Sequence, residues 1–252
     1  MNCQELNTIE GSKFIPINSK KIPTVKEWQI SEKEHDLNNC VGVGIVCGKL
    51  SNYLEAIDID CKYDLTGKLF ENYKRLVHEL DKDLLNRLVV QKTRNGGYHF
   101  IYRCSVIAGN VKLANRPTTD EEKLQTYNEE YKIALIKNPD DAKAKQVAEK
   151  IAKGDKCRVL IETRGEGGYI ACHPSEGYEI IHGDFYGIKE ITAEQRDLLH
   201  GVARQFNQIL DEVIVPKKDN IQKTTGLSTF DDYNKRGDVV SLLQEHGWKV
   251  VS

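Results

Sequence analysis

Several features are missing from this sequence, and each absence excludes a class of protein. No run of apolar residues approaches the ~18 that a membrane-spanning helix needs. The first residues, 1–12, are polar and acidic, whereas a secretory signal peptide is basic and then apolar. We therefore expect a soluble, cytoplasmic chain that has no membrane partner.

Closely spaced cysteines are also missing. The seven cysteines are scattered and include no CxxC pair, so they predict neither a disulfide framework nor a zinc knuckle. Most free cysteines are simply packed in the core, which is the interpretation that we favour. The alternative is a zinc site built from distant residues, namely His35, Cys40, Cys47, Cys172 and His173.

A large basic excess is absent as well. Lys and Arg number 36 and Asp and Glu 38, which gives a net charge of −2. Proteins that hold DNA mainly through its phosphates are usually strongly basic, so any DNA contact must come from a local basic patch. With 252 residues, the chain can bury a sizeable core without disulfides or a structural metal.

Short alternating or β-branched runs predict strands in much of the chain. The segment 41–60 has two such runs around a turn-rich centre, which predicts a β-hairpin. A second hairpin is predicted over 87–104, around an Asn-Gly-Gly turn. Residues 157–175 again read as strand, glycine turn and strand.

Helical periodicity predicts four further regions. A short helix is expected near 24–29 from a capping-box pattern, and longer helices over 66–80 and 192–210 from their apolar spacing. The charged segment of about 118–154 predicts a two-helix insertion.

These elements divide the chain into a main domain and a tail. Residues 1–212 are expected to form one domain, followed by a polar, basic linker over 213–229. Residues 230–252 are too few for a core of their own. They are interpreted as a docked tail or as the start of a truncated C-terminal module.

Asp58 and Asp60 are the strongest candidates for chemistry. They alternate with Ile57 and Ile59, so a strand places both carboxylates on one face and both isoleucines on the other. Two like charges about 7 Å apart repel each other, and a divalent cation that prefers carboxylate oxygens relieves the repulsion. The alternative is a solvated strand edge.

Two further motifs also fall on predicted strands. His99 follows Gly97, where the backbone can approach a ligand closely, and it can donate to a phosphate; the alternative is a packed or surface histidine. Glu162 ends an apolar run and is followed by Arg164, which can neutralise a triphosphate or simply pair with Glu162. A third carboxylate is the usual requirement of two-metal nucleotidyl transfer.

The order of these motifs is more specific than any one of them. Hydrophobic-Asp-hydrophobic-Asp at 57–60, small-x-His at 97–99 and hydrophobic-acid at 161–162 resemble the archaeo-eukaryotic primase superfamily. In particular, the chain resembles the primase-polymerase (Prim-Pol) domains of phages and plasmids, over roughly residues 12–210. It implies an α+β fold with a mixed, largely antiparallel sheet like an RNA-recognition platform, carrying the helical insertion at its edge.

The resemblance also implies an activity and its partners. The chain would be a primase/polymerase that joins NTPs or dNTPs on single-stranded DNA in phage or mobile-element replication, with a helicase module fused at or after the C-terminus. Catalysis would use two Mg²⁺ or Mn²⁺ ions held by Asp58, Asp60 and Glu162. The nucleotide would be bound by His99, Arg164, Gly97, Lys92 and Arg94.

Two departures from the family pattern concern this site. The family often has serine where Gly97 stands, so Thr93 or a backbone N–H is needed to replace the hydroxyl. Glu162 stands where Asp is common, and its extra methylene could shift the metal.

Two other functions remain open from the sequence. One is a catalytically idle module that binds single-stranded DNA, and the other is a two-metal nuclease, which also uses carboxylates and a histidine. Binding of a nucleoside triphosphate without cleavage of DNA separates these from a polymerase.

Overall fold

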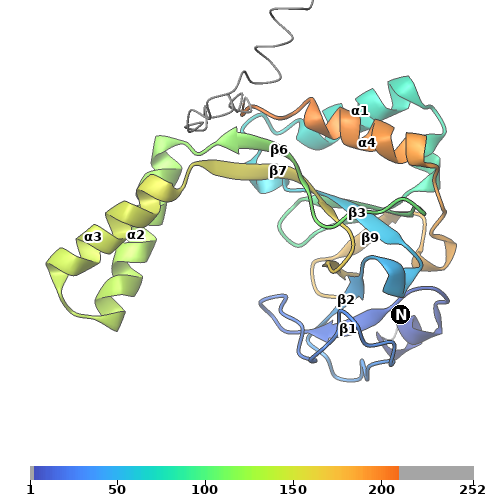
Figure 1. Ribbon diagram of the computed structural model, residues 1–252, viewed down its shortest axis with the longest axis horizontal. Coiled ribbons are helices and arrows are strands. Elements are labelled where there is room, and N and C mark those ends of the chain that lie inside the picture. Colours follow the sequence, from blue (N-terminus) through green and yellow to red (C-terminus); the bar gives the residue numbers. More distant parts are fainter. Residues whose placement is uncertain (1–2, 210–252) are drawn as a thin grey trace, which may run out of the picture. The chain divides into compact units, whose positions relative to one another are not determined.

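The computed structural model describes residues 3–209 (Figure 1). The predicted linker at 213–229 and the segment 230–252 lie outside this range. The described residues form two antiparallel sheets and four α-helices, which confirms the expected α+β fold with a helical insertion. None of these helices is long and apolar enough to cross a membrane.

The larger sheet has six strands, and the central strand β3 carries the Asp58 motif. Its order is β6-β7-β3-β5-β4-β9, and every neighbouring pair is antiparallel. The strands span Leu54–Ile59 (β3), Val89–Lys92 (β4), Tyr98–Arg103 (β5), Lys112–Pro117 (β6), Cys157–Arg164 (β7) and Glu179–His182 (β9).

The smaller sheet has the order β1-β2-β8. Its strands are β1 (Phe14–Ile17), β2 (Gly42–Val46) and β8 (Tyr169–Cys172). Residues of β1, β2 and β8 share one apolar cluster with Leu54 and Ala56 of β3. The smaller sheet therefore packs against one face of the larger one.

Two helices cover the opposite face of the six-stranded sheet (Figure 1). These are α1 (Leu69–Leu80) and α4 (Ala193–Arg204), and their apolar stripes pack on Ile57 and Ile59. Because side chains alternate along a strand, Asp58 points to the other face, the one shared with the smaller sheet. Burial of each isoleucine contributes ~1.5–3 kcal/mol, which anchors the strand that presents Asp58.

A buried ion pair also ties α4 to β3. The carboxylate of Glu55, which is fully buried, accepts hydrogen bonds from Arg196 Nε at 2.6 Å and Nη2 at 2.8 Å. The Tyr102 hydroxyl donates to the same carboxylate at 2.8 Å. Burial alone would raise the pKa of Glu55, but the bonds from His200, Arg196 and Tyr102 hold that pKa below its ordinary value.

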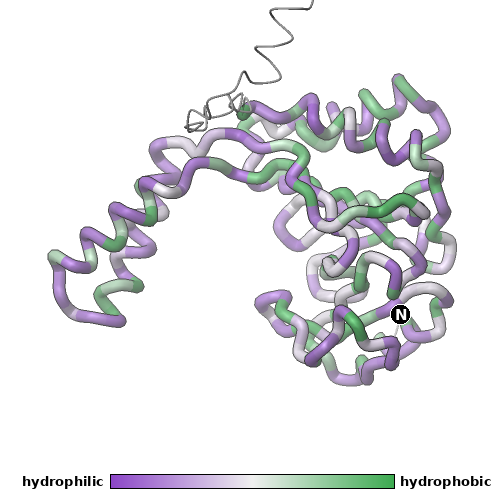
Figure 2. The backbone as a smooth tube through the Cα atoms, in the orientation of Figure 1, coloured by the Kyte–Doolittle hydropathy of each residue, from purple (hydrophilic) through white to green (hydrophobic). Residues whose placement is uncertain are grey.

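The predicted insertion is confirmed as two helices between β6 and β7, α2 (Asp120–Lys137) and α3 (Asp141–Gly154). They pack on each other, and hydrophilic residues predominate along both (Figure 2). Arg116 pairs with Glu122 at 2.7 Å, and Arg158 pairs with Asp155. These pairs clamp the base of the insertion to the ends of β6 and β7.

Two local predictions are wrong. Residues 41–60 do not form a hairpin, because β2 and β3 belong to different sheets and only a single bridge, Gly48 to Leu54, joins them. Residues 24–29 form turns in place of a helix, and Glu27 has a φ of +54°. A positive φ at a non-glycine residue is incompatible with a right-handed helix.

Candidate active site

Antiparallel pairing places four polar side chains in one row across the six-stranded sheet. Asp58 of β3 lies directly opposite His99 of β5 on one side and Glu162 of β7 on the other. His99 in turn lies opposite Gln91 of β4. Residues directly opposite each other on antiparallel strands share a face, so Glu162, Asp58, His99 and Gln91 all point to the same side.

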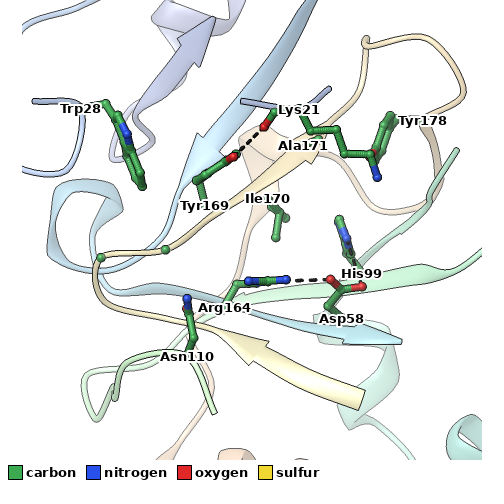
Figure 3. A pocket seen from close by; sticks show the side chains of 12 residues that line it. Lys21, Trp28, Asp58, His99, Asn110, Arg164, Tyr169, Ile170, Ala171 and Tyr178 are labelled. Atoms are coloured by element: carbon green, nitrogen blue, oxygen red, sulfur yellow. Dashed lines mark hydrogen bonds and ion pairs between the residues drawn. The ribbon is translucent and has the colours of Figure 1, made fainter. Parts of the chain in front are cut away.

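Asp58 lies between two cationic or hydrogen-bonding groups (Figure 3). Its Oδ1 is 3.4 Å from His99 Nε2, and its Oδ2 is 3.8 Å from Arg164 Nε. Burial alone would raise the pKa of Asp58, but His99, Arg164 and Lys21 together hold that pKa below its ordinary value. The site therefore presents an ionised carboxylate.

The other two predicted carboxylates adjoin Asp58. Asp60 follows the end of β3, and burial together with the charge of Asp58 raises its pKa, although Lys62 Nζ lies 3.7 Å away. Glu162 Oε1 lies 2.5 Å from Arg164 Nη2. Burial raises the pKa of Glu162, and the negative charges of Asp58 and Asp60 oppose the lowering effect of Arg164.

The donor chemistry of this row fits a divalent cation. Asp58 and Glu162 offer carboxylate oxygens on one face, and Asp60 adds a third acid nearby, which suits Mg²⁺ or Mn²⁺. Arg164 supplies the positive charge between Asp58 and Glu162. Among residues 3–209, no three His, Cys, Asp or Glu side chains already converge as a metal cluster.

The same finding bears on the zinc alternative. Within the described range, the histidines and cysteines considered for zinc form no group that could hold a metal. All seven cysteines are free thiols, and Cys47, Cys104 and Cys172 are buried. Burial at these three positions agrees with the interpretation of packed cysteines there.

A pocket of about 280 Å³ opens beside Asp58, His99 and Arg164 (Figure 3). Sequence reasoning did not assign five further side chains that line it, and most of them lie on loops. The Tyr169 hydroxyl donates to the Lys21 carbonyl at 2.5 Å, and the Trp28 ring meets the Tyr169 ring edge-on at 4.9 Å. The unassigned residues are Lys21, Trp28, Asn110, Tyr169 and Tyr178.

One sequence signal pointed toward this pocket wall. Trp28 is one of only two tryptophans, and it follows the basic segment that contains Lys21. Lys21 Nζ lies 5.5 Å from the centroid of the Tyr178 ring, so a cation and an aromatic face meet at the rim. Nothing in the local sequence indicated that Tyr178 would join them.

Gly97 has a steric reason to be glycine. A Cβ at this position would lie 2.4 Å from the carbonyl oxygen of Ile59, closer than any real Cβ contact. The Gly97 N–H donates to Thr93 Oγ1 at 3.1 Å. The threonine hydroxyl considered as a replacement for the family's serine thus lies beside Gly97, at the turn that leads to His99.

Lys92 and Arg94 are exposed and do not line the pocket. Lys92 lies opposite Tyr98, whose ring stacks on Phe70 of α1 at a centroid distance of 3.5 Å. Because Lys92 is one residue from Gln91, it points away from the face of the row. Arg94 lies nearer the pocket rim, where its Nη2 donates to the Ser19 carbonyl at 3.2 Å.

Comparison with known proteins identifies the family of this chain. No curated protein matches the sequence. The family model described as the bifunctional DNA primase/polymerase N-terminal domain, Prim-Pol, matches residues 7–194, which include the whole row and the helical insertion. The chain therefore belongs to the Prim-Pol family of DNA primase/polymerases, which are nucleotidyltransferases.

Proposed function

We propose that this chain joins NTPs or dNTPs on a single-stranded DNA template, with Asp58, Asp60 and Glu162 as its catalytic carboxylates. The observation that carries the proposal is the row across β7, β3 and β5, which sets two acids and a histidine side by side next to a pocket. Family membership indicates the reaction, and the row supports the proposed location of that reaction in this chain.

The carboxylates hold the reacting groups in this proposal. Asp58 stays ionised, because His99 and Arg164 hold its pKa low, and it is therefore ready to bind a cation. Bound Mg²⁺ or Mn²⁺ would supply activation of the primer 3′-hydroxyl and neutralisation of the leaving pyrophosphate. Asp60 and Glu162 complete the acidic set. Burial raises both of their pKa values, and neighbouring carboxylate charges raise them further, a repulsion that a cation would relieve.

The pocket beside the row is the proposed nucleotide site. His99 directs Nε2 toward Asp58, at the pocket wall, where an N–H can donate to a triphosphate oxygen. Arg164 and Lys21 bring positive charge to the same wall. Trp28, Tyr169 and Tyr178 offer aromatic faces for a base or sugar, since every base has a face that can stack.

The replication context belongs to the proposal too. By its resemblance to phage and plasmid proteins, the chain would act in phage or mobile-element replication, together with a helicase module at or after its C-terminus. Gly97 is proposed to allow the backbone close to the nucleotide, and Arg94 to add charge at the rim.

A gel assay tests the proposal. The protein is incubated with single-stranded DNA, all NTPs and dNTPs, and Mg²⁺ or Mn²⁺, with and without an annealed primer. Products that disappear in Asp58→Asn support the proposal. Shortened input DNA would identify a nuclease instead, and DNA binding without nucleotide binding or any product would identify an idle module.

A further inference from the structure

The buried side chain of Gln91 makes contacts that the reaction does not explain. Gln91 is fully buried in β4, directly opposite His99. Its Nε2 lies 2.7 Å from His99 Nδ1 and donates to the Ala171 carbonyl at 3.0 Å. Its Oε1 accepts from the backbone N–H of His173 at 3.1 Å.

The two backbone contacts fix which way the Gln91 amide points. A backbone N–H can only donate, so the atom beside the His173 N–H must be the amide oxygen. A carbonyl can only accept, so the atom beside the Ala171 oxygen must be the amide nitrogen. The usual ambiguity between amide oxygen and nitrogen is thereby resolved by chemistry.

This orientation determines the role of the histidine ring. The group beside His99 Nδ1 is an NH₂, which donates and cannot accept, so Nδ1 must be an unprotonated acceptor. The ring proton then lies on Nε2, which faces Asp58 Oδ1 at 3.4 Å. Both hydrogens of the Gln91 amide are thus used, one for the ring and one for the smaller sheet.

We propose that Gln91 is a positioning residue, which fixes His99 as an Nε2–H donor directed at Asp58 and the nucleotide pocket. The ring orientation depends on how the two sheets meet, because Ala171 lies on β8 of the smaller sheet and His173 follows it. The link to nucleotide binding rests on the proposed function. The hydrogen-bond roles of Gln91 and His99 are independent of the proposed function.

The first test is ¹⁵N NMR of the labelled full chain at one fixed pH, without metal or nucleotide. The His99 signals are identified by their loss in His99→Asn. We expect an unprotonated, hydrogen-bonded Nδ1 and a protonated Nε2. A proton on Nδ1 in the wild-type protein would overturn the proposal.

Gln91→Glu changes the donor into an acceptor at nearly constant shape. We expect Nδ1 to become protonated when the new carboxyl is ionised, because a carboxylate oxygen then faces it. The ¹³C shift of the carboxyl carbon reports its ionisation, and an unchanged Nδ1 beside an ionised carboxylate would overturn the proposal. If this variant does not fold, Gln91→Met serves in its place: the Nδ1 signal should move to that of a free acceptor, and an unchanged signal would show that the amide was never bonded to it.

Ser175→Ala is the matched control. The Ser175 hydroxyl accepts from the Val43 N–H and donates to the Val43 carbonyl, so it ties down the same turn without contacting His99. It should leave the His99 signals unchanged. A shift of Nδ1 in this control as large as that in Gln91→Glu would attribute the effect to the turn and overturn the proposal.

Steady-state kinetics then separates the positioning role of Gln91 from the proposed contact between His99 and the nucleotide. Gln91→Met leaves the ring without its hydrogen-bonded partner, so it should raise the KM for nucleotide about three- to tenfold, with a smaller change in kcat. A free Nδ1 in this variant with an unchanged KM supports the positioning role and counts against His99 as a nucleotide contact. An Nδ1 signal that is unchanged in this variant overturns the positioning role whatever the KM.

Discussion

The carboxylate of Asp58 and the imidazole of His99 face each other across β3 and β5, with Oδ1 3.4 Å from Nε2. Asp58→Asn keeps the shape and removes the charge, so we expect synthesis to fall by at least ~100-fold while the melting temperature stays within a few degrees. Gel assays and thermal melts measure the two effects. Glu71→Gln, on the exposed face of α1, is the control. Retention of most activity in Asp58→Asn would remove Asp58 from the catalytic set.

His99→Ala should act chiefly on nucleotide binding. The lost donor is expected to raise the apparent KM for nucleotide about tenfold or more, with a smaller change in kcat, because the ring holds no reacting atom in the proposed role. Initial rates at varied nucleotide concentration measure both constants. His78→Ala, exposed on α1, should leave them unchanged. An unaltered KM in His99→Ala would exclude the contact.

Gly97→Ser restores the residue that is frequent in the family, yet we expect it to destabilise this chain. Its Cβ would press on the Ile59 carbonyl at 2.4 Å. The cost of such overpacking is about 1–3 kcal/mol, or several degrees of melting temperature. Gly154→Ala is the control, since nothing lies within 4 Å of its Cβ position. Equal melting temperatures for Gly97→Ser and wild type would mean that the Ile59 carbonyl can move aside.

The base of the helical insertion should loosen in acid. The hydrogen bonds from Arg116 lower the pKa of Glu122 from 4.5 to about 2, and those from Arg158 lower the pKa of Asp155 from 3.8 to about 2. A lowered carboxyl pKa stabilises the fold above the ordinary pKa, and this contribution disappears as the pH falls toward 2. After solvent screening, each carboxylate contributes about 1 kcal/mol to the free energy of unfolding.

Hydrogen exchange of the α2 and α3 amides between pH 5 and pH 2.5, corrected for intrinsic rates, measures this effect. Protection should fall with pH in the wild-type protein and should already be low at pH 5 in Glu122→Gln. Glu129→Gln, on the same helix and outside the cluster, should behave like the wild type. Constant protection across this range would show that the clamp does not hold the helices.

The buried pair of Glu55 and Arg196 should contribute far more to the free energy of unfolding than a surface pair does. Glu55→Ala leaves a buried guanidinium without its partner, which costs about 3–5 kcal/mol. Arg75→Ala breaks the exposed pair with Glu79 and should cost less than ~0.5 kcal/mol. Urea unfolding measures both, and a similar small change in the two variants would refute the ranking.

Local pattern predicted much of the fold correctly. The hairpin of β4 and β5, the paired helices of the insertion and the face that Ile57 and Ile59 bury all follow from periodicity and turn residues. The hairpin over 41–60 failed for a conformational reason. Asn52 and Tyr53 both have positive φ, and this turn sends β3 into the other sheet. A tyrosine gives no sequence signal for such a backbone.

The site was predicted less completely than the fold. Alternation placed Asp58 on the correct face, and family resemblance selected Glu162 and His99, which the register then placed beside it. Gln91 escaped notice, because a single polar residue in a strand shows no partner until the second sheet is in place. Lys21 and Tyr178 were missed because loops carry them to the pocket.

The ion pairs at the base of the insertion separate the structure of the two helices from the position of the row that contains Asp58. The ladder between these strands continues to Pro117 and Cys157, and the Arg116–Glu122 and Arg158–Asp155 pairs close it just beyond. Glu162 is also held opposite Asp58 by the ladder between β3 and β7. We therefore expect changes to the helices beyond Glu122 and before Asp155 to leave the register of Glu162 unaltered.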